Sequence, residues 1–531
     1  MQEITKTKNQ RPKTDRLMWI FLAMAAVTLY FSGLSIPLVG PDEPRYAQVA
    51  REMFEHGDWV TPTLGGANWF EKPALLYWLQ IIGYKIFGVS EFSARFGSAV
   101  FGLLTVFSLW ILGRSLAAEG TKKNGEIKNK KTFSENSISF TKNDFANWLA
   151  LIAASSIGLI VFSRGASFDI ILTFPLTASL VAFFIFDQSK NKSLTTYHLP
   201  LTTFYFFIGI SLLAKGLVGI VFPLAIVAFY YVLSFKLPSR TFIVSLVWGT
   251  ILSLLVASIW YVPMYLAHGF TFIDEFFIQH HFARYTSNKY SHPQPFYFFL
   301  WVLPLMTLPW LPFFLASIWN FVTVQSSKFK VQSQFLVSLF SSSSPLFLFS
   351  LCWIIVPLIF FSFSGSKLPG YILPALPAAL ILIAIYVWHF VQKSYKRKLL
   401  VQISALAMFA LVWLTLHFFI ASHTNSDTVK HLMKTADSQG FTGEKVLNLH
   451  TISHNAEFYA AGRLIREADG KLKKFPGVHE VLEEIKNQKG ENVLVLVPLE
   501  YLKELTSSDL VSVQVLSDNG ELAIVLVNAK N

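Results

Sequence analysis

Two adjacent carboxylates, Asp42 and Glu43, follow the first long apolar run of the chain. They open a segment, residues 39–73, that is rich in charged and aromatic side chains, although only 14% of the whole sequence is charged. One interpretation makes Asp42 the N-cap of a short helix with Pro44 in its first turn. The other makes Asp42 a general base at the mouth of a partly dehydrated cavity, where it takes a proton from an attacking hydroxyl. The two roles are compatible, and we place Glu43 with Asp42 among the candidate catalytic residues.

Asp169 and Lys215 interrupt apolar runs further along the chain. An aspartate in a membrane span costs about 2.5 to 3.5 kcal/mol at the bilayer centre and less near the interface, so it usually has a partner or a function. For Asp169 the structural alternative is a salt bridge with Arg164. For Lys215 it is a tight turn between two spans, whereas the functional interpretation is that the ammonium holds a phosphate.

Three further cations, Lys72, Arg284 and Lys367, occur in segments that we assign to the same side of the membrane as Lys215. One such cation alone would be a snorkelling residue or a contact to a lipid headgroup. Four cations beside two or three carboxylates indicate an anionic substrate and an acid–base reaction. A lipid phosphate that enters sideways from the bilayer satisfies both requirements.

A metal site is the weaker pattern. His280, His281 and His292 lie in one outer loop and could bind a divalent metal ion together with Glu71, but their spacing is not the His-Glu-x-x-His of a helical zinc site. Hydrogen bonding within an aromatic loop is the alternative. The sequence has no glycine-rich phosphate loop after a strand, which argues against a nucleotide donor and favours a donor already attached to a lipid.

The composition places these residues in a membrane protein. Of 531 residues 53% are hydrophobic, including 51 Phe and 14 Trp, which indicates a polytopic membrane protein. The single cysteine, Cys352, excludes an internal disulfide framework and a multi-cysteine metal site. The net charge of +12 comes mostly from short loops between apolar runs, so we interpret it as a topology signal and predict no nucleic-acid partner.

A basic tail, residues 1–16, precedes the first span and is predicted to be cytoplasmic. Apolar runs close in length to the ~20 residues that a bilayer needs predict eleven crossings. They are residues 17–36, 92–116, 145–162, 170–186, 199–214, 217–235, 242–266, 296–319, 345–363, 371–391 and 399–421. The segment 74–87 is shorter and is expected to lie at the interface.

Lysine and arginine accumulate in the loops assigned to the cytoplasm, namely 122–142, 190–192, 236–240, 328–330 and 393–398. The outer loops carry the isolated charges, aromatics and histidines, above all in residues 37–91. From residue 425 the composition becomes that of a soluble domain. Strands are predicted at 446–449, 493–497, 511–516 and 523–527, with helices at 456–461, 478–489 and 500–505. We therefore expect a small α/β domain, residues 425–531, outside the cytoplasm.

Several outer segments resemble the GT-C glycosyltransferases that use polyprenyl-phosphate sugars, above all the bacterial lipid A aminoarabinose transferases and their protein O-mannosyltransferase-like relatives. The resemblance rests on 41–47 (Pro-Asp-Glu-Pro-Arg-Tyr-Ala), 51–53 (Arg-Glu-Met), 70–79 (Phe-Glu-Lys-Pro-Ala-Leu-Leu-Tyr-Trp-Leu), 281–285 (His-Phe-Ala-Arg-Tyr), 292–296 (His-Pro-Gln-Pro-Phe) and 367–374 (Lys-Leu-Pro-Gly-Tyr-Ile-Leu-Pro). It covers most of residues 17–421.

The resemblance implies an all-α membrane domain of about 11 to 13 transmembrane helices at 17–421, with juxtamembrane helices in the outer loop and a periplasmic domain at the carboxyl end. It also implies residue roles. Asp42 matches the catalytic, acceptor-activating carboxylate and Asp169 the second functional aspartate. Lys72, Lys215 and Arg284 match positions that hold the donor phosphate, and we place Lys367 and Tyr371 with them. Glu71 and His281 are similar to the pair associated with a metal ion.

The function expected from this resemblance is transfer of a sugar from undecaprenyl phosphate to lipid A, a glycan or a protein. We expect a multi-pass protein of the bacterial inner (plasma) membrane with its active site on the extracytoplasmic face. The alternatives are a flippase or transporter of polyprenyl-linked glycans and a ligase of surface polysaccharide. A transporter would be expected to show paired broken helices and charges near the midplane, whereas here the charges gather at one face.

Overall fold

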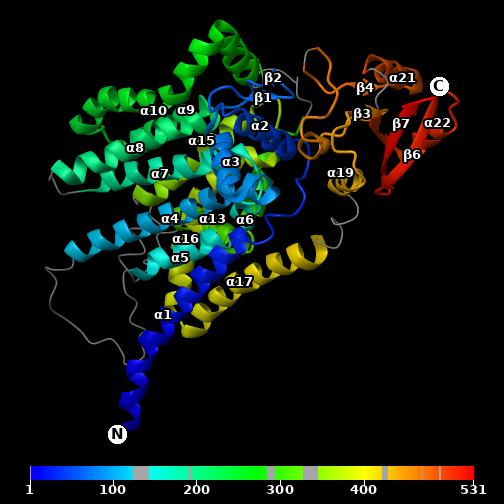
Figure 1. Cartoon of the computed structure of the whole chain (residues 1–531). Coiled ribbons are helices and arrows are strands. Elements are labelled where there is room, and N and C mark those ends of the chain that lie inside the picture. The colour runs from blue at the N-terminus through cyan, green and yellow to red at the C-terminus, as the bar shows by residue number, and fades with distance from the viewer. Residues whose placement is uncertain are drawn as a thin grey trace. The chain divides into compact units, whose positions relative to one another are not determined.

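The structure is a computed structural model of the chain and describes residues 2–123, 143–189, 194–283, 293–326, 345–420, 428–468, 470–488 and 492–530. The basic loops 122–142, 190–192 and 328–330 that orient the predicted spans lie wholly or partly outside these residues. Figure 1 labels the helices and strands of the chain, which divides into two compact units. The helical unit comprises residues 1–32, 71–75 and 98–412, and the mixed unit comprises 33–70, 76–97 and 413–531.

The helical unit is built from long apolar helices. In chain order its elements are α1 (Gln2–Phe31), most of α4 (Glu91–Lys123), α5 (Asn143–Ala154), α6 (Ile157–Phe162), α7 (Phe168–Gln188), α8 (Leu194–Lys215), α9 (Val218–Ser234), α10 (Arg240–Ile273), η2 (Asp274–Ala283), α12 (Phe298–Met306), α13 (Leu311–Ser326), α15 (Pro345–Ser362), η3 (Pro369–Ala375), α16 (Leu376–Gln392) and α17 (Tyr395–Leu414).

Within the described residues seven helical stretches are long and apolar enough to cross a membrane, or eight if α12 and α13, bent by 117°, form one broken span. Four shorter apolar helices accompany them: 16–31, 75–87, 144–154 and 218–234. A multi-span helical membrane domain is thus confirmed. The predicted spans 17–36, 145–162 and 217–235 correspond to these shorter helices. In the second of these, α5 ends at Ala154 and α6 begins at Ile157.

Helices α7 and α16 form the centre of the helical unit. Nearly all side chains of α7 are buried, and α7 packs on α8 and on η3. The turn formed by η3 is anchored by Trp353, whose Nε1 donates to the carbonyl oxygen of Pro374 at 2.8 Å. By contrast α10 exposes large apolar side chains such as Val247 and Leu255, as expected of a helix that faces lipid.

The mixed unit joins the first predicted outer loop to the carboxyl-terminal region. The first part holds α2 (Asp42–His56), a two-stranded ribbon of β1 (Thr63–Leu64) and β2 (Ala67–Asn68), α3 (Leu75–Phe87) from residue 76, and the start of α4. The second part holds η4 (Thr415–Ile420), α19 (Val429–Ser438), β3 (Val446–Leu449), α20 (Ala456–Tyr459), β4 (Lys474–Phe475), α21 (Val478–Asn487), β5 (Val493–Pro498), η5 (Leu499–Tyr501), α22 (Leu502–Thr506), β6 (Val511–Asp518) and β7 (Leu522–Ala529).

The five-stranded sheet has the order β4-β3-β5-β7-β6. β3 is parallel to β4 and β5, whereas β7 is antiparallel to both β5 and β6. Side chains of β5 alternate between two apolar cores: Val495 packs with α21 on one face, and Leu494 and Leu496 pack with α19 and α20 on the other. The small carboxyl-terminal domain with a mixed sheet is confirmed.

Candidate functional site

Asp169 and Lys215 form an ion pair at the ends of two neighbouring helices of the helical unit. Asp169 is the second residue of α7, and its backbone N–H donates to the hydroxyl of the N-cap Ser167 at 3.2 Å. Lys215 is the last residue of α8, and its Nζ donates to Oδ1 of Asp169. Both side chains are only 17% exposed. A carboxylate at a helix amino end and an ammonium at a helix carboxyl end both complement the helix dipole, so the pair is favoured at this place.

This pairing corrects one alternative from the sequence. The structural partner expected for Asp169 was Arg164, but the recorded salt bridge joins Asp169 to Lys215. The guanidinium of Arg164 instead donates to the carbonyl oxygens of Leu29 and Ser32 at the end of α1. Lys215 does lie at a tight turn between two helices, since only Gly216 and Leu217 separate α8 from α9. This position is also compatible with a contact between its ammonium and a phosphate, which stays a prediction.

Tyr371 and Gly370 complete this group. The Nζ of Lys215 lies 5.0 Å from the centroid of the Tyr371 ring, a distance typical of a cation–π contact. A Cβ at Gly370 would lie 1.9 Å from Oδ2 of Asp169, so any side chain there would displace the carboxylate. We call Asp169, Lys215, Gly370 and Tyr371 the Asp169 cluster. The structure thus brings together three of the residues that the sequence selected.

Lys367 has a different recorded contact. Its side chain is buried, and Nζ donates to the carbonyl oxygen of Ser364 at 2.7 Å, within the turn that precedes η3. The hydroxyl of Ser364 donates in turn to the carbonyl oxygen of Ser366 at 3.0 Å. The ammonium therefore stabilises this turn, and its contact to a donor phosphate stays a prediction.

Glu71 and Lys72 lie half-buried in the turn before α3. Arg284 and His292 lie outside the described residues, and so does the side chain of His281. Among the described residues there is no group of three or more His, Cys, Asp or Glu side chains that could hold a metal ion.

Asp42 lies in the mixed unit as the first residue of α2. The N-cap is Pro41, with no side-chain capping bond, so the expectation that Asp42 itself is the cap is wrong. Its carboxylate is 54% exposed and lies 3.5 Å from Nη1 of Arg45, one turn further along the helix. An exposed carboxylate in the first turn is stabilised by the helix dipole and stays accessible to a substrate.

Arg45 links Asp42 to the carboxyl-terminal domain. Its Nη2 lies 3.4 Å from Nδ1 of His454, and its guanidinium lies 5.4 Å from the centroid of the Trp69 ring. Burial, and next the positive charge of Arg45, lower the pKa of His454 below its usual value. His454 is therefore neutral at pH 7, and its Nδ1 can accept a hydrogen bond from Arg45.

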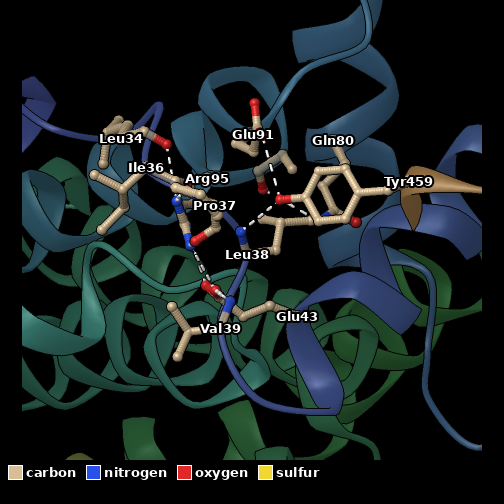
Figure 2. Close-up of polar contacts among 11 residues, drawn as sticks. Leu34, Ile36, Pro37, Leu38, Val39, Glu43, Gln80, Glu91, Arg95 and Tyr459 are labelled. Atoms are coloured by element: carbon tan, nitrogen blue, oxygen red, sulfur yellow. Dashed lines mark hydrogen bonds and ion pairs between the residues drawn. The ribbon is translucent and has the colours of Figure 1, made fainter. Parts of the chain in front are cut away.

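Glu43 is held by a buried arginine that the sequence analysis missed (Figure 2). Arg95 is 2% exposed and binds both carboxylate oxygens of Glu43, at 2.6 and 3.2 Å. The same guanidinium donates at 3.0 Å to the carbonyl oxygens of Leu34 and Pro37 and also to that of Ile36. Arg95 thus fixes the segment that leads into α2. An arginine inside a predicted span was the available signal, since such a charge needs a partner.

Tyr459 is the second residue that the sequence analysis missed. Its hydroxyl accepts from the backbone N–H of Leu38 at 2.8 Å and donates to Glu91 at 3.2 Å (Figure 2). Burial raises the pKa of Tyr459, so the hydroxyl stays protonated and can donate. Glu91 also pairs with Lys430 at 2.6 Å. Tyr459 thus joins α20 of the carboxyl-terminal domain to the segment that precedes Asp42 and to the first residue of α4.

Comparisons with known proteins agree with this architecture. Residues 17–119 match the family described as dolichyl-phosphate-mannose-protein mannosyltransferase. The chain is 28% identical over 394 residues to undecaprenyl phosphate-alpha-4-amino-4-deoxy-L-arabinose arabinosyl transferase 1 of Sodalis glossinidius. This alignment covers 70% of this chain and 60% of that relative. It is 30% identical over 368 residues to the corresponding transferase of Shewanella sediminis. That alignment covers 68% of this chain and 58% of the relative.

Among solved structures, the crystal structure of ArnT from Cupriavidus metallidurans bound to undecaprenyl phosphate matches with a TM-score of 0.76. The match covers 96% of this chain and 97% of that one, at 20% identity. The fold is therefore shared along nearly the whole chain. The sequence alignment spans about three fifths of the length of the curated relatives named above.

Proposed function

We propose that this chain is a GT-C glycosyltransferase that uses a polyprenyl-phosphate sugar. Its similarity to these enzymes in sequence and in fold is confirmed. It moves a sugar from undecaprenyl phosphate to an acceptor on the extracytoplasmic face of the inner membrane. The observation that carries the proposal is the half-buried Lys215, whose ammonium is held at a helix end by Asp169 and Tyr371.

Lys215 has the chemistry that a donor phosphate needs. An ammonium at low exposure interacts strongly with a phosphate oxygen because little water screens the charge. Asp169 keeps Nζ in one position, and the ring of Tyr371 covers another side of it. Lys72, Lys367 and Arg284 are proposed as further phosphate contacts, on the basis of the motif resemblance.

The reaction breaks the bond between the anomeric carbon of the sugar and the phosphate oxygen. The phosphate leaves with the bonding electron pair, and cations that neutralise its growing charge lower the barrier. Asp42 takes the proton of the acceptor hydroxyl as that oxygen bonds to the anomeric carbon. General-base assistance of this kind contributes on the order of 100- to 10,000-fold. Asp169 acts by positioning Lys215, and Glu43 by holding α2 through Arg95.

A metal ion has no step in this proposal. Glu71 is the one member of the proposed metal pair whose side chain the structure describes, and the described residues supply no cluster of ligands around it. The acceptor is proposed as lipid A, another glycan or a protein.

The test uses the purified full chain in nanodiscs with an undecaprenyl-phosphate sugar and candidate acceptors, followed by mass spectrometry. Formation of a glycosylated acceptor together with free undecaprenyl phosphate supports the proposal. Movement of the intact donor across a vesicle membrane without cleavage would instead identify a transporter. Transfer of a completed polymer rather than a single sugar would identify a polysaccharide ligase.

A further inference from the structure

A basic cavity lies within the mixed unit, and its lining includes none of the residues discussed as catalytic. It has a volume of about 390 Å³. Its lining comes from the segment around Ser35, from Leu416 and His417 in the first half of η4, and from the first two turns of α19. Four of the described side chains that line it are basic: His417, Lys430, His431 and Lys434. No acidic residue is among the described residues of the lining, which leave out 421–427. The volume is within the range of small-ligand sites, which begins at about 300 Å³.

Helix α19 gives the cavity most of its positive character. Thr428 caps this helix, with its hydroxyl accepting from the backbone N–H of His431 at 3.4 Å. The positive end of the helix dipole therefore adds to Lys430, His431 and Lys434, which occupy the first two turns. Glu91 offsets the charge of Lys430 through their 2.6 Å ion pair and also fixes the position of that side chain. Lys434 provides a further positive charge, and the rings of His417 and His431 provide N–H groups that can donate hydrogen bonds.

The two residues that follow His417 in η4 are aromatic, and we treat them as an apolar rim on this side of the cavity. Phe418 and Phe419 are exposed next to His417, and the His417 ring stacks on Trp413 with 4.5 Å between centroids. η4 directly continues α17, one of the helices long and apolar enough to cross a membrane. Aromatic side chains at the end of a span are typical of the interface between hydrocarbon and water. A basic cavity with such a rim suits an amphipathic ligand better than a free ion.

We propose that this cavity binds the phosphate of an anionic membrane lipid. The phosphate oxygens accept hydrogen bonds from Lys434, His431 and His417, and the acyl chains lie along Phe418 and Phe419. None of the lining residues is a predicted donor-phosphate residue, so the site does not depend on the proposed transfer reaction. Inorganic phosphate shares the headgroup chemistry but not the acyl chains, which allows the two sources to be separated.

The test is native mass spectrometry of the purified full chain, titrated with phosphatidylglycerol. The double variant His431→Gln/Lys434→Gln is expected to lower the apparent affinity for one bound lipid by about tenfold or more, as for loss of charged hydrogen bonds. Lys503→Gln, which removes an exposed lysine from α22 of the same domain, is the matched control and should bind like the unmodified chain. Lys434→Arg keeps the charge and should retain the lipid, which separates loss of charge from misfolding.

Inorganic phosphate is added in a second arm, with and without the lipid. The proposal expects it to compete weakly, because it gains nothing from the apolar rim. Equal retention of phosphatidylglycerol by the unmodified chain and the double variant would overturn the proposal. So would displacement of the lipid by inorganic phosphate at equal concentration, because the site would then be one for a free ion.

Discussion

Lys215 and Asp169 lie 46 residues apart in the sequence and form an ion pair where the end of α8 meets the start of α7. The amino end of α7 stabilises the negative charge of Asp169, and the carboxyl end of α8 stabilises the positive charge of Lys215. Both side chains are largely shielded from solvent. A partly dehydrated pair of this kind is costly to break by removal of one partner, since the other charge is left without compensation. The pair is therefore well suited to hold an ammonium ready for a phosphate.

Lys215→Gln is expected to raise the KM for the undecaprenyl-phosphate sugar by about tenfold or more, because a charged hydrogen bond to the phosphate is lost. Steady-state kinetics with varied donor concentration measure this effect. Lys236→Gln, at an exposed lysine after α9, is the matched control. An unchanged donor KM in a correctly inserted Lys215→Gln protein would contradict the proposed phosphate contact.

Gly370→Ala tests the geometry of the Asp169 cluster without changing any charge. The new methyl group would lie 1.9 Å from Oδ2 of Asp169, so the carboxylate and the ammonium it holds must move. We expect a loss of activity of at least tenfold, measured as kcat/KM. Gly443→Ala, where a Cβ meets nothing within 4 Å, should leave activity unchanged. Equal activity of the two variants would show that the position of Asp169 is not critical.

A second pair of glycines tests the contact between the β1–β2 ribbon and the carboxyl-terminal domain. Gly65 and Gly66 both have positive φ, 64° and 79°, so alanine costs about 1–2 kcal/mol at either. Only at Gly65 would the methyl group meet a neighbour, the Arg466 side chain at 1.9 Å, which is tied to Glu457. Thermal unfolding of the full chain should show a larger destabilisation for Gly65→Ala than for Gly66→Ala. Equal losses would mean that Arg466 moves aside without cost.

His454 predicts a pH dependence of stability. Because the folded protein holds the pKa of His454 below the usual ~6.5, the unfolded chain binds more protons as the pH falls below that value. Stability that is present above pH ~6.5 is therefore lost progressively in acid. The charges facing the ring are those of Arg45, Asp42 and Arg466.

His454→Gln removes the titrating ring and keeps a hydrogen-bonding side chain. Melting temperatures at pH ~7.5 and ~5.5 should fall less with acid in this variant than in the unmodified protein. An identical fall in both proteins would assign the acid sensitivity to other groups.

Strands and helices could be predicted from the sequence where the segment is long enough for its pattern of apolar residues to repeat. The strands β3, β5, β6 and β7 and the apolar helices follow from alternation and from hydropathy. β4 was missed because two residues carry no period. The break between α5 and α6 was missed because the hydropathy on its two sides is the same.

Partners were harder to predict than positions. Asp169 and Lys215 could each be selected as a charge within an apolar run, but their pairing depends on how α7 and α8 pack, so the nearer Arg164 was the expected partner. Arg95 and Tyr459 were not selected at all. Their roles come from backbone groups of residues 34–38, which no side-chain pattern reveals.

The central claim is that Asp42 activates the acceptor in a sugar transfer from undecaprenyl phosphate. The direct measurement is the rate of acceptor glycosylation by the membrane-inserted Asp42→Asn protein at saturating donor. Glu55→Gln, at an exposed carboxylate on the same helix, is the control and should match the unmodified chain. The account predicts a loss of at least about 100-fold for Asp42→Asn, the lower bound for a general base. An inserted Asp42→Asn protein with undiminished transfer would contradict it.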